Sequence, residues 1–203
     1  MQNVQGVIFD LGGVLIDWNP MYLYRKVFAD EAAASDFLAR ICTREWNEQQ
    51  DAGRPLREAT EDLARLHPER EYEIRAFYGR WKEMLGGIIP GTVEVIGDLK
   101  AAGIRVFALT NWSHETFPVA RELFPELALF EQVVVSGEHR CAKPDPKLYR
   151  IAIEAFGLPA SALAFVDDSP RNVAAAEAAG IRSLLFTDST MLRRDLKALG
   201  LPL

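Results

Sequence analysis

The chain has 203 residues, of which 49% are hydrophobic and 26% are charged. This length allows one hydrophobic core plus a small accessory domain, and the composition excludes the disordered and fibrous classes of protein. The net charge of −6 argues against a nucleic-acid groove, which is built from clustered Lys and Arg, and it requires that an anionic ligand be held by a local cation or by backbone N–H groups.

The cysteines and the lengths of the apolar runs indicate the compartment. Cys42 and Cys141 lie far apart in the sequence and form no metal-type cluster, so we expect free thiols. The N-terminus lacks the basic start of a signal peptide, and no segment approaches the roughly 18 apolar residues of a membrane span. We therefore expect a cytoplasmic protein, a monomer or a homodimer, whose partners include neither membranes nor nucleic acid.

The first predicted element is a short strand at 7–9, which ends at Asp10 and is followed by Gly12 and Gly13. The region that follows, 17–87, has helical patterns but no convincing strand. We interpret it as a helical cap, inserted after the first strand of a core formed by 1–16 and 88–203. Within the cap, helices separated by Pro and Gly are expected at 22–28, 32–42, 56–66 and 72–84.

After the cap, apolar runs alternate with helical stripes. The runs are apolar throughout, as expected of strands that are buried on both faces of a parallel sheet. The alternation predicts βαβ units and hence an α/β fold with a doubly wound, Rossmann-like parallel sheet. The runs are 105–109, 132–135, 164–166 and 183–186, and the helical stripes are 93–99, 148–155 and 173–179.

Polar residues follow several of these runs at the point where the predicted strand ends. Asp10, the pair 110–111 and the pair 167–168 all hold such positions, and Lys143 follows the strand at 132–135 in a loop. The carboxyl ends of parallel strands meet at one edge of a sheet, so these groups are expected to lie together. Clustered carboxylates repel one another unless a cation lies among them, and Mg²⁺ favours carboxylates, waters and phosphate oxygens. The pattern therefore predicts a Mg²⁺ site that receives a phosphate.

The chain resembles the haloacid dehalogenase-like hydrolase superfamily over essentially its full length. The resemblance rests on motifs that appear in the expected order, FDLGGV at 9–14, LTN at 109–111, KPDP at 143–146 and FVDDS at 165–169. The helical insertion resembles the small cap of that superfamily. The resemblance implies a phosphatase with a Rossmann-like core and a small phosphorylated metabolite as substrate.

The resemblance also implies a metal site and a nucleophile. Asp10 is expected to attack the substrate and to form an aspartyl-phosphate. The Mg²⁺ ligands are expected to be Asp10, the backbone carbonyl of Gly12, Asp168 and Asp167.

Further residues are implied to hold the phosphoryl group. Thr110 and Asn111 are expected to bind its oxygens, beside Gly12 and Gly13. Lys143 is expected to neutralise charge between the nucleophile and the phosphate.

One position departs from the superfamily pattern. Most of its phosphatases carry a second Asp two residues after the nucleophile, which protonates the leaving oxygen and then activates water, and here that position is Gly12. General acid–base help of about 10²–10⁴-fold is then in question. A first hypothesis is a substrate with a better leaving group, such as a sugar 1-phosphate, an acyl phosphate or an aryl phosphate. This hypothesis fits a resemblance to the bacterial glucose-1-phosphate phosphatase branch.

Two further hypotheses would also account for Gly12. A 2-haloacid dehalogenase needs neither metal nor leaving-group protonation, and Lys143 with Tyr149 is similar to the dehalogenase pattern. Dehalogenases, however, typically carry Ser where this chain has Asp167 and Asp168. A non-catalytic protein that binds phosphorylated ligands is the third hypothesis. We favour the phosphatase, because the nucleophile, the lysine and the metal acids are all retained.

The polar segment 43–54 surrounds one tryptophan and lies between two predicted cap helices. Polar groups around an aromatic platform suit a sugar or another small polar ligand. We therefore predict Trp46, Asn47 and Arg54 as specificity residues. Trp18, Trp112 and His114 are further candidates for the entrance of the site.

Overall fold

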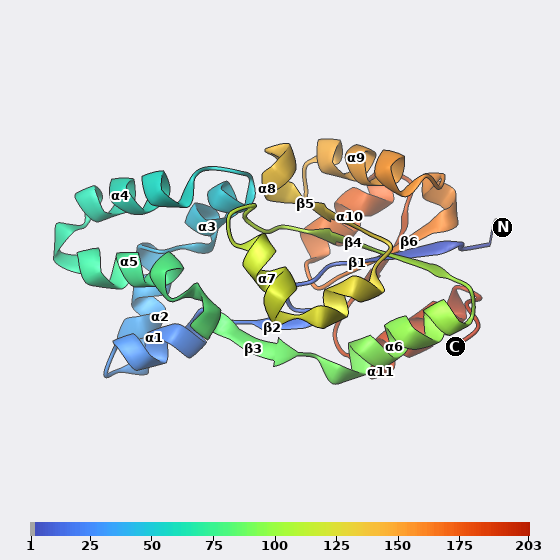
Figure 1. Ribbon diagram of the computed structural model, residues 1–203, viewed down its shortest axis with the longest axis horizontal. Helices are drawn as coiled ribbons and strands as arrows, with labels where there is room; N and C mark the ends of the chain where they lie inside the picture. The colour runs from blue at the N-terminus through green and yellow to red at the C-terminus, as the bar shows by residue number, and fades with distance from the viewer. Residues whose placement is uncertain (1–2) are drawn as a thin grey trace.

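The computed structural model describes residues 3–203 and contains a central parallel sheet (Figure 1). The strand order is β5-β4-β1-β6-β7, which is the doubly wound arrangement predicted from the sequence. Every predicted core strand is confirmed to within about two residues. The strands are β1 (Gly6–Phe9), β4 (Arg105–Thr110), β5 (Gln132–Val135), β6 (Leu163–Asp167) and β7 (Arg182–Leu185).

Helices cover both faces of this sheet, and the side chains on both faces of its central strands β1 and β6 are therefore buried. In β1, Val7 and Phe9 belong to one hydrophobic cluster, whereas Ile8 between them belongs to the other. The first cluster packs under α6 and α11, and the second packs under α9 and α10 (Figure 1). The helices of the core are α6 (Pro90–Ala101), α7 (Phe117–Leu123), α8 (Ser136–His139), α9 (Pro146–Phe156), α10 (Pro170–Ala178) and α11 (Ser189–Ala198), with short 3₁₀ turns η3 (Pro125–Leu129) and η4 (Ala160–Ala162).

The segment between β1 and α6 forms a helical layer at one end of the molecule (Figure 1). It has its own hydrophobic cluster, in which Tyr24, Phe37, Trp46 and Phe77 are buried. Its helices are α1 (Met21–Val27), α2 (Glu31–Arg40), α3 (Arg44–Asp51), α4 (Leu56–Leu66) and α5 (Glu71–Gly79), with 3₁₀ turns η1 (Pro68–Arg70) and η2 (Trp81–Met84). The domain boundaries remain a prediction, in which residues 17–87 form the cap and residues 1–16 and 88–203 form the core.

Two predictions about this helical layer were wrong. A two-stranded antiparallel sheet of β2 (Ile16–Trp18) and β3 (Leu85–Ile88) joins it to the core, although no strand was expected there. The two strands pair with each other across about 70 residues of sequence, which no local pattern reveals. The predicted helix 72–84 also ends early, at Gly79, and a separate 3₁₀ turn follows.

The remaining predictions concern thiols and membrane spans. Cys42 and Cys141 are buried and unpaired, as expected. Among the helices that the structure describes, none is long and apolar enough to cross a bilayer.

Candidate active site

Asp10 and Lys143 meet at the carboxyl edge of the sheet. Asp10 follows β1 directly, and its N–H donates to the carbonyl oxygen of Val166 in β6 at 2.8 Å. The Nζ of Lys143 lies 2.9 Å from Oδ1 of Asp10 and 2.6 Å from Oδ2 of Asp167, and the lysine side chain is fully buried. The structure thus brings together a carboxylate in the position expected for a nucleophile and the cation expected beside it.

A third carboxylate completes a cluster at this edge. One oxygen each of Asp10, Asp167 and Asp168 lies within 4.8 Å of the others. Burial raises the pKa of Asp10 to about 8; the charge of Lys143 opposes this shift and the neighbouring acids add to it. For Lys143, burial lowers the pKa, but the two carboxylates outweigh it and the net shift is upward. The cluster is therefore short of positive charge, and a divalent cation would supply it.

Asp167 is fully buried and surrounded by donors. Besides Lys143, the backbone N–H of Ser169 donates to it at 2.8 Å, and the amide of Asn172 donates to both of its oxygens, at 3.0 and 3.1 Å. These bonds fit a residue that positions Lys143. Asp168 is exposed at the same edge and is the freer of the two acids.

The last residue of β4, Thr110, and the residue after it, Asn111, have different surroundings. The Oγ1 of Thr110 is buried and has no hydrogen-bond partner among the described residues, which is rare for a buried hydroxyl, although Thr110 is not among the cavity-lining residues. The amide of Asn111, in contrast, donates to the carbonyl oxygen of Lys143 at 3.0 Å and accepts from its N–H at 2.8 Å. Asn111 therefore fixes the lysine loop, whereas Thr110 fits the expected role at a phosphoryl oxygen.

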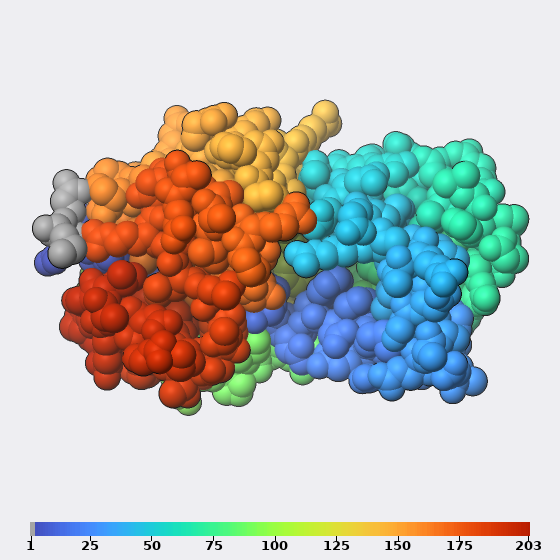
Figure 2. Space-filling view, turned by 180° about the vertical axis from the view of Figure 1, so that it is seen from behind, coloured from blue at the N-terminus to red at the C-terminus, as the bar shows by residue number. Residues whose placement is uncertain are grey.

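A cavity of about 480 Å³ lies between the helical layer and the core, with Asp10, Gly12 and Gly13 in its wall. Figure 2 shows the outside of this junction, where the blue and cyan helices meet the orange part of the core. Trp18 and Trp112 line the cavity, as expected of residues near the entrance. His114 is exposed and is not among the lining residues.

The structure places the predicted specificity residues unevenly. Asn47 lines the cavity, but Trp46 is buried in the cap cluster against Phe77, and Arg54 pairs with Asp62. Neither Trp46 nor Arg54 lines the cavity, which contradicts the idea of a tryptophan platform. The physical reason is that the polar segment is itself a helix, α3, which turns Trp46 inward.

Asp51 is a cavity residue that was not predicted from the sequence. It ends α3, lines the cavity, and accepts hydrogen bonds from Nδ2 of Asn47 at 2.9 Å and from the backbone N–H of Ser113. Burial raises its pKa to about 7, with a further contribution from Glu48. The feature of the sequence that could have indicated Asp51 is its i, i+4 spacing from Asn47 on a helix that is capped by Thr43.

Tyr149 bears on the dehalogenase alternative. Its ring is fully buried edge-on to Phe165, and its hydroxyl donates to the carbonyl oxygen of Asn172 at 2.9 Å. It is not among the cavity-lining residues. The Lys–Tyr pattern in the sequence therefore reflects packing near the lysine loop in this structure.

Comparisons with known proteins agree with this site. The family model of haloacid dehalogenase-like hydrolases matches residues 4–180. The chain is 28% identical over 197 residues to a sesquiterpene phosphatase of Aspergillus oryzae, covering 96% of both chains. It is 30% identical over 187 residues to a phosphoglycolate phosphatase of Cereibacter sphaeroides, covering 90% of this chain and 85% of the relative. A haloacid dehalogenase family enzyme of Bacteroides thetaiotaomicron, in a magnesium complex, superimposes with a TM-score of 0.72 at 20% identity and covers 95% of this chain and 100% of that one.

A parallel sheet with buried acids and a lysine at its carboxyl edge, under a helical cap, defines a capped α/β hydrolase. The chain belongs to the haloacid dehalogenase-like hydrolase family. Its phosphatase relatives place it on the phosphatase side of that family.

Proposed function

We propose that the protein is a Mg²⁺-dependent phosphatase that hydrolyses a small phosphorylated metabolite through an aspartyl-phosphate on Asp10. The observation that carries this proposal is the position of Lys143 between Asp10 and Asp167, with Asp168 in the same cluster. Together with a bound divalent cation, Lys143 would offset the repulsion between a phosphate dianion and the attacking carboxylate.

The donor set fits a hard divalent cation. It consists of the carboxylate oxygens of Asp10, Asp167 and Asp168, which lie close together at the edge of the sheet. Asp10, the backbone carbonyl of Gly12 and Asp168 would hold the ion, with Asp167 contributing directly or through water. When bound, the metal supplies positive charge that offsets the developing charge on the phosphoryl oxygens. The magnesium complex of the Bacteroides enzyme supports this choice of metal.

The residues of the chain then divide the work. An Asp10 oxygen attacks phosphorus, the ester bond breaks and the alcohol leaves; water later attacks the aspartyl-phosphate and the phosphorus–Asp10 bond breaks. Thr110 holds one phosphoryl oxygen through its free hydroxyl, and Lys143 balances the charge of the nucleophile. Asn111 keeps that lysine in place through its backbone.

A screen of phosphorylated compounds with Mg²⁺ and with EDTA tests the proposal, with Asp10→Asn as the matched variant. We expect phosphate release that needs the metal and is lost in the variant. Metal-independent halide release from 2-haloacids would instead support a dehalogenase, and phosphate binding without turnover would support a binding protein.

The identity of the alcohol is a separate matter. The resemblance to glucose-1-phosphate phosphatases suggested a sugar phosphate, whereas the relatives are named for phosphoglycolate and for sesquiterpenes. The side chains that line the cavity indicate the substrate class more directly than the names of the relatives do, because they would contact the alcohol part, which differs between these compounds.

A further inference from the structure

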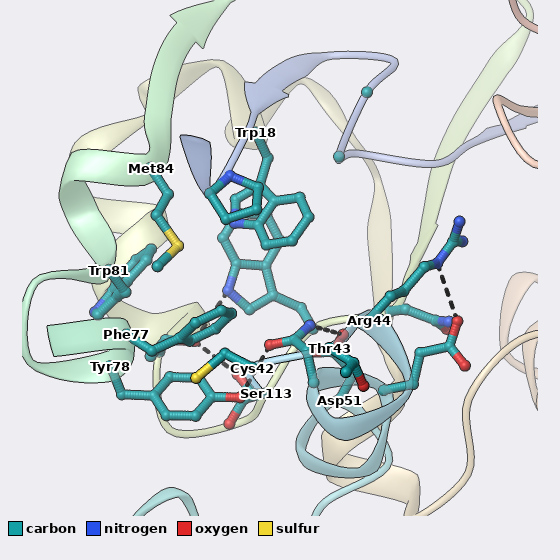
Figure 3. A pocket seen from close by; sticks show the side chains of 18 of the residues that line it. Trp18, Cys42, Thr43, Arg44, Asp51, Phe77, Tyr78, Trp81, Met84 and Ser113 are labelled. Atoms are coloured by element: carbon teal, nitrogen blue, oxygen red, sulfur yellow. Dashed lines mark hydrogen bonds and ion pairs between the residues drawn. The ribbon is translucent and has the colours of Figure 1, made fainter. Parts of the chain in front are cut away.

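The cavity beside Asp10 has two chemically different walls. Its core edge carries the polar groups described above. The other wall consists mainly of aromatic and long apolar side chains, several of which are labelled in Figure 3. They include Trp18, Leu38, Phe77, Trp81 and Met84 from the cap and Trp112 from the core.

The polar groups of the cap wall are already paired with one another. Asn47 donates through Nδ2 to Asp51 and accepts through Oδ1 from the hydroxyl of Tyr78 at 2.9 Å. Arg44 and Glu48 form an ion pair at 3.1 Å. A sugar would need partners for several hydroxyls here, and hydroxyls buried without partners cost free energy.

We propose that the alcohol part of the substrate is apolar. It would be an aromatic or hydrocarbon group that packs against the apolar side chains of this wall. The inference rests on the phosphatase proposed above and names its substrate class. Trp18 supports it, because this large side chain is 39% exposed at the cavity and gains burial from an apolar ligand.

The test compares kcat/KM for 1-naphthyl phosphate and geranyl monophosphate with that for glucose 1-phosphate and phosphoglycolate, all with Mg²⁺. We expect the apolar esters to be preferred by at least about tenfold. In Trp18→Ala, kcat/KM for the apolar esters should fall about tenfold, whereas that for the polar esters should fall by less than about twofold. Tyr72→Ala is the control, because Tyr72 is 68% exposed and is not among the cavity-lining residues.

The outcomes separate the two proposals. Metal-dependent turnover with equal or better use of the polar esters would overturn the apolar substrate class alone. Absence of phosphate release from every ester would overturn the phosphatase, and the substrate class with it.

A second observation concerns the acid that is absent at Gly12. Asp51 reaches the same cavity from the cap, and its carboxylate accepts the N–H of Ser113, in the loop that follows Thr110. Lys143, which contacts Asp10, lies close enough for its charge to act on Asp51. The structure assigns Asp51 as the general acid and base for the leaving alcohol and the attacking water.

In this step, the electron pair of the breaking P–O bond goes to the ester oxygen, which takes the proton of Asp51. The resulting carboxylate then takes a proton from the water that attacks the aspartyl-phosphate, and the electron pair of the phosphorus–Asp10 bond returns to Asp10. Burial supports the role, because it raises the pKa of Asp51 to about 7, with Glu48 adding to the shift and Lys143 opposing it. The phenol of Tyr78 is a further titratable group near this carboxyl.

The readout is the dependence of kcat/KM on the leaving group. With Asp51 acting as the acid, the wild type should show a shallow dependence across aryl and alkyl phosphates, and Asp51→Asn should lose about 10²-fold on alkyl esters while keeping turnover of 4-nitrophenyl phosphate. Gly12→Asp in the Asp51→Asn background should restore alkyl ester turnover. Glu45→Gln is the control, because Glu45 is exposed on the same helix and is not among the cavity-lining residues, and it should leave the dependence shallow.

If Asp51→Asn lowered kcat/KM equally for all esters, Asp51 would be a residue that positions the cap, and its acid–base role would be overturned. A steep dependence in the wild type would also overturn that role, and would favour a good leaving group as the compensation for Gly12. Neither result bears on the metal-dependent nucleophilic reaction at Asp10.

Discussion

The side chain of Asn111 forms two hydrogen bonds with the backbone of Lys143, donating to its carbonyl oxygen at 3.0 Å and accepting from its N–H at 2.8 Å. The contact joins the ends of two neighbouring strands, since Asn111 follows β4 and Lys143 lies beyond β5. It fixes the backbone from which the buried lysine reaches Asp10, so the position of the cation depends on the amide of Asn111.

Asn111→Ala should therefore lower kcat by about 10–100-fold, because a displaced lysine no longer balances the nucleophile. The loss of two hydrogen bonds should cost about 1–2 kcal/mol of unfolding free energy. Steady-state kinetics and thermal unfolding measure both effects. His114→Ala is the control in the same loop, since His114 is exposed, and an equal fall in kcat there would argue against the positioning role.

Lys143→Met leaves Asp10 and Asp167 without their common cation. Removing one partner from a buried ion pair costs about 3–5 kcal/mol, so the variant should unfold at lower temperature in EDTA. Mg²⁺ should raise its melting temperature more than that of the wild type, because the ion then supplies charge that the lysine supplied. Lys147→Met, at an exposed position nearby, should change neither value. A melting temperature of Lys143→Met equal to that of the wild type in EDTA would contradict the role of this ion pair.

Much of the core was predictable from the sequence, and the cap was less so. Strands such as β1 and β6 are buried on both faces, so their apolar runs and the acids that follow them are visible in the chain itself. The strands β2 and β3 pair with each other, and this pairing links segments that are far apart in sequence.

The residues that line the cavity could not be predicted from the sequence, for a related reason. Segment 43–54 is polar in composition, and its composition does not say which side of a helix faces a cavity. In the structure, Trp46 and Gln50 are buried, whereas Asn47 and Asp51 line the cavity. The packing of Trp46 against Phe77 and Tyr78 favours the observed orientation, and this packing is a tertiary contact that the sequence does not show.

The stability of the protein should depend on pH through Asp51. Its pKa is about 7 in the folded state and near 3.8 when unperturbed, so the folded state keeps a proton that the unfolded chain releases between these values. The stabilisation that comes from the proton held by Asp51 is complete below about pH 4. It is lost as the pH rises to about 7, and it stays lost above that pH. The melting temperature of Asp51→Asn minus that of the wild type, measured in EDTA, should therefore increase across this range. Asp36→Asn, at a side chain that is 58% exposed, is the control, and a constant difference for Asp51→Asn would contradict the raised pKa.

Two neighbouring glycines should respond in opposite ways to the same substitution. A Cβ at Gly12 meets nothing within 4 Å, and its φ is not in the left-handed region, so Gly12→Ala should stabilise the protein by about 0.4–1 kcal/mol through the unfolded state. Gly13 has a φ of +73°, and a Cβ there would lie 2.5 Å from Oδ2 of Asp168. Gly13→Ala should therefore cost about 1–2 kcal/mol and, because Asp168 must move aside, weaken Mg²⁺ binding. Thermal unfolding and a Mg²⁺ titration of both variants measure this contrast, and equal behaviour would show that the glycine turn does not shape the site at Asp168.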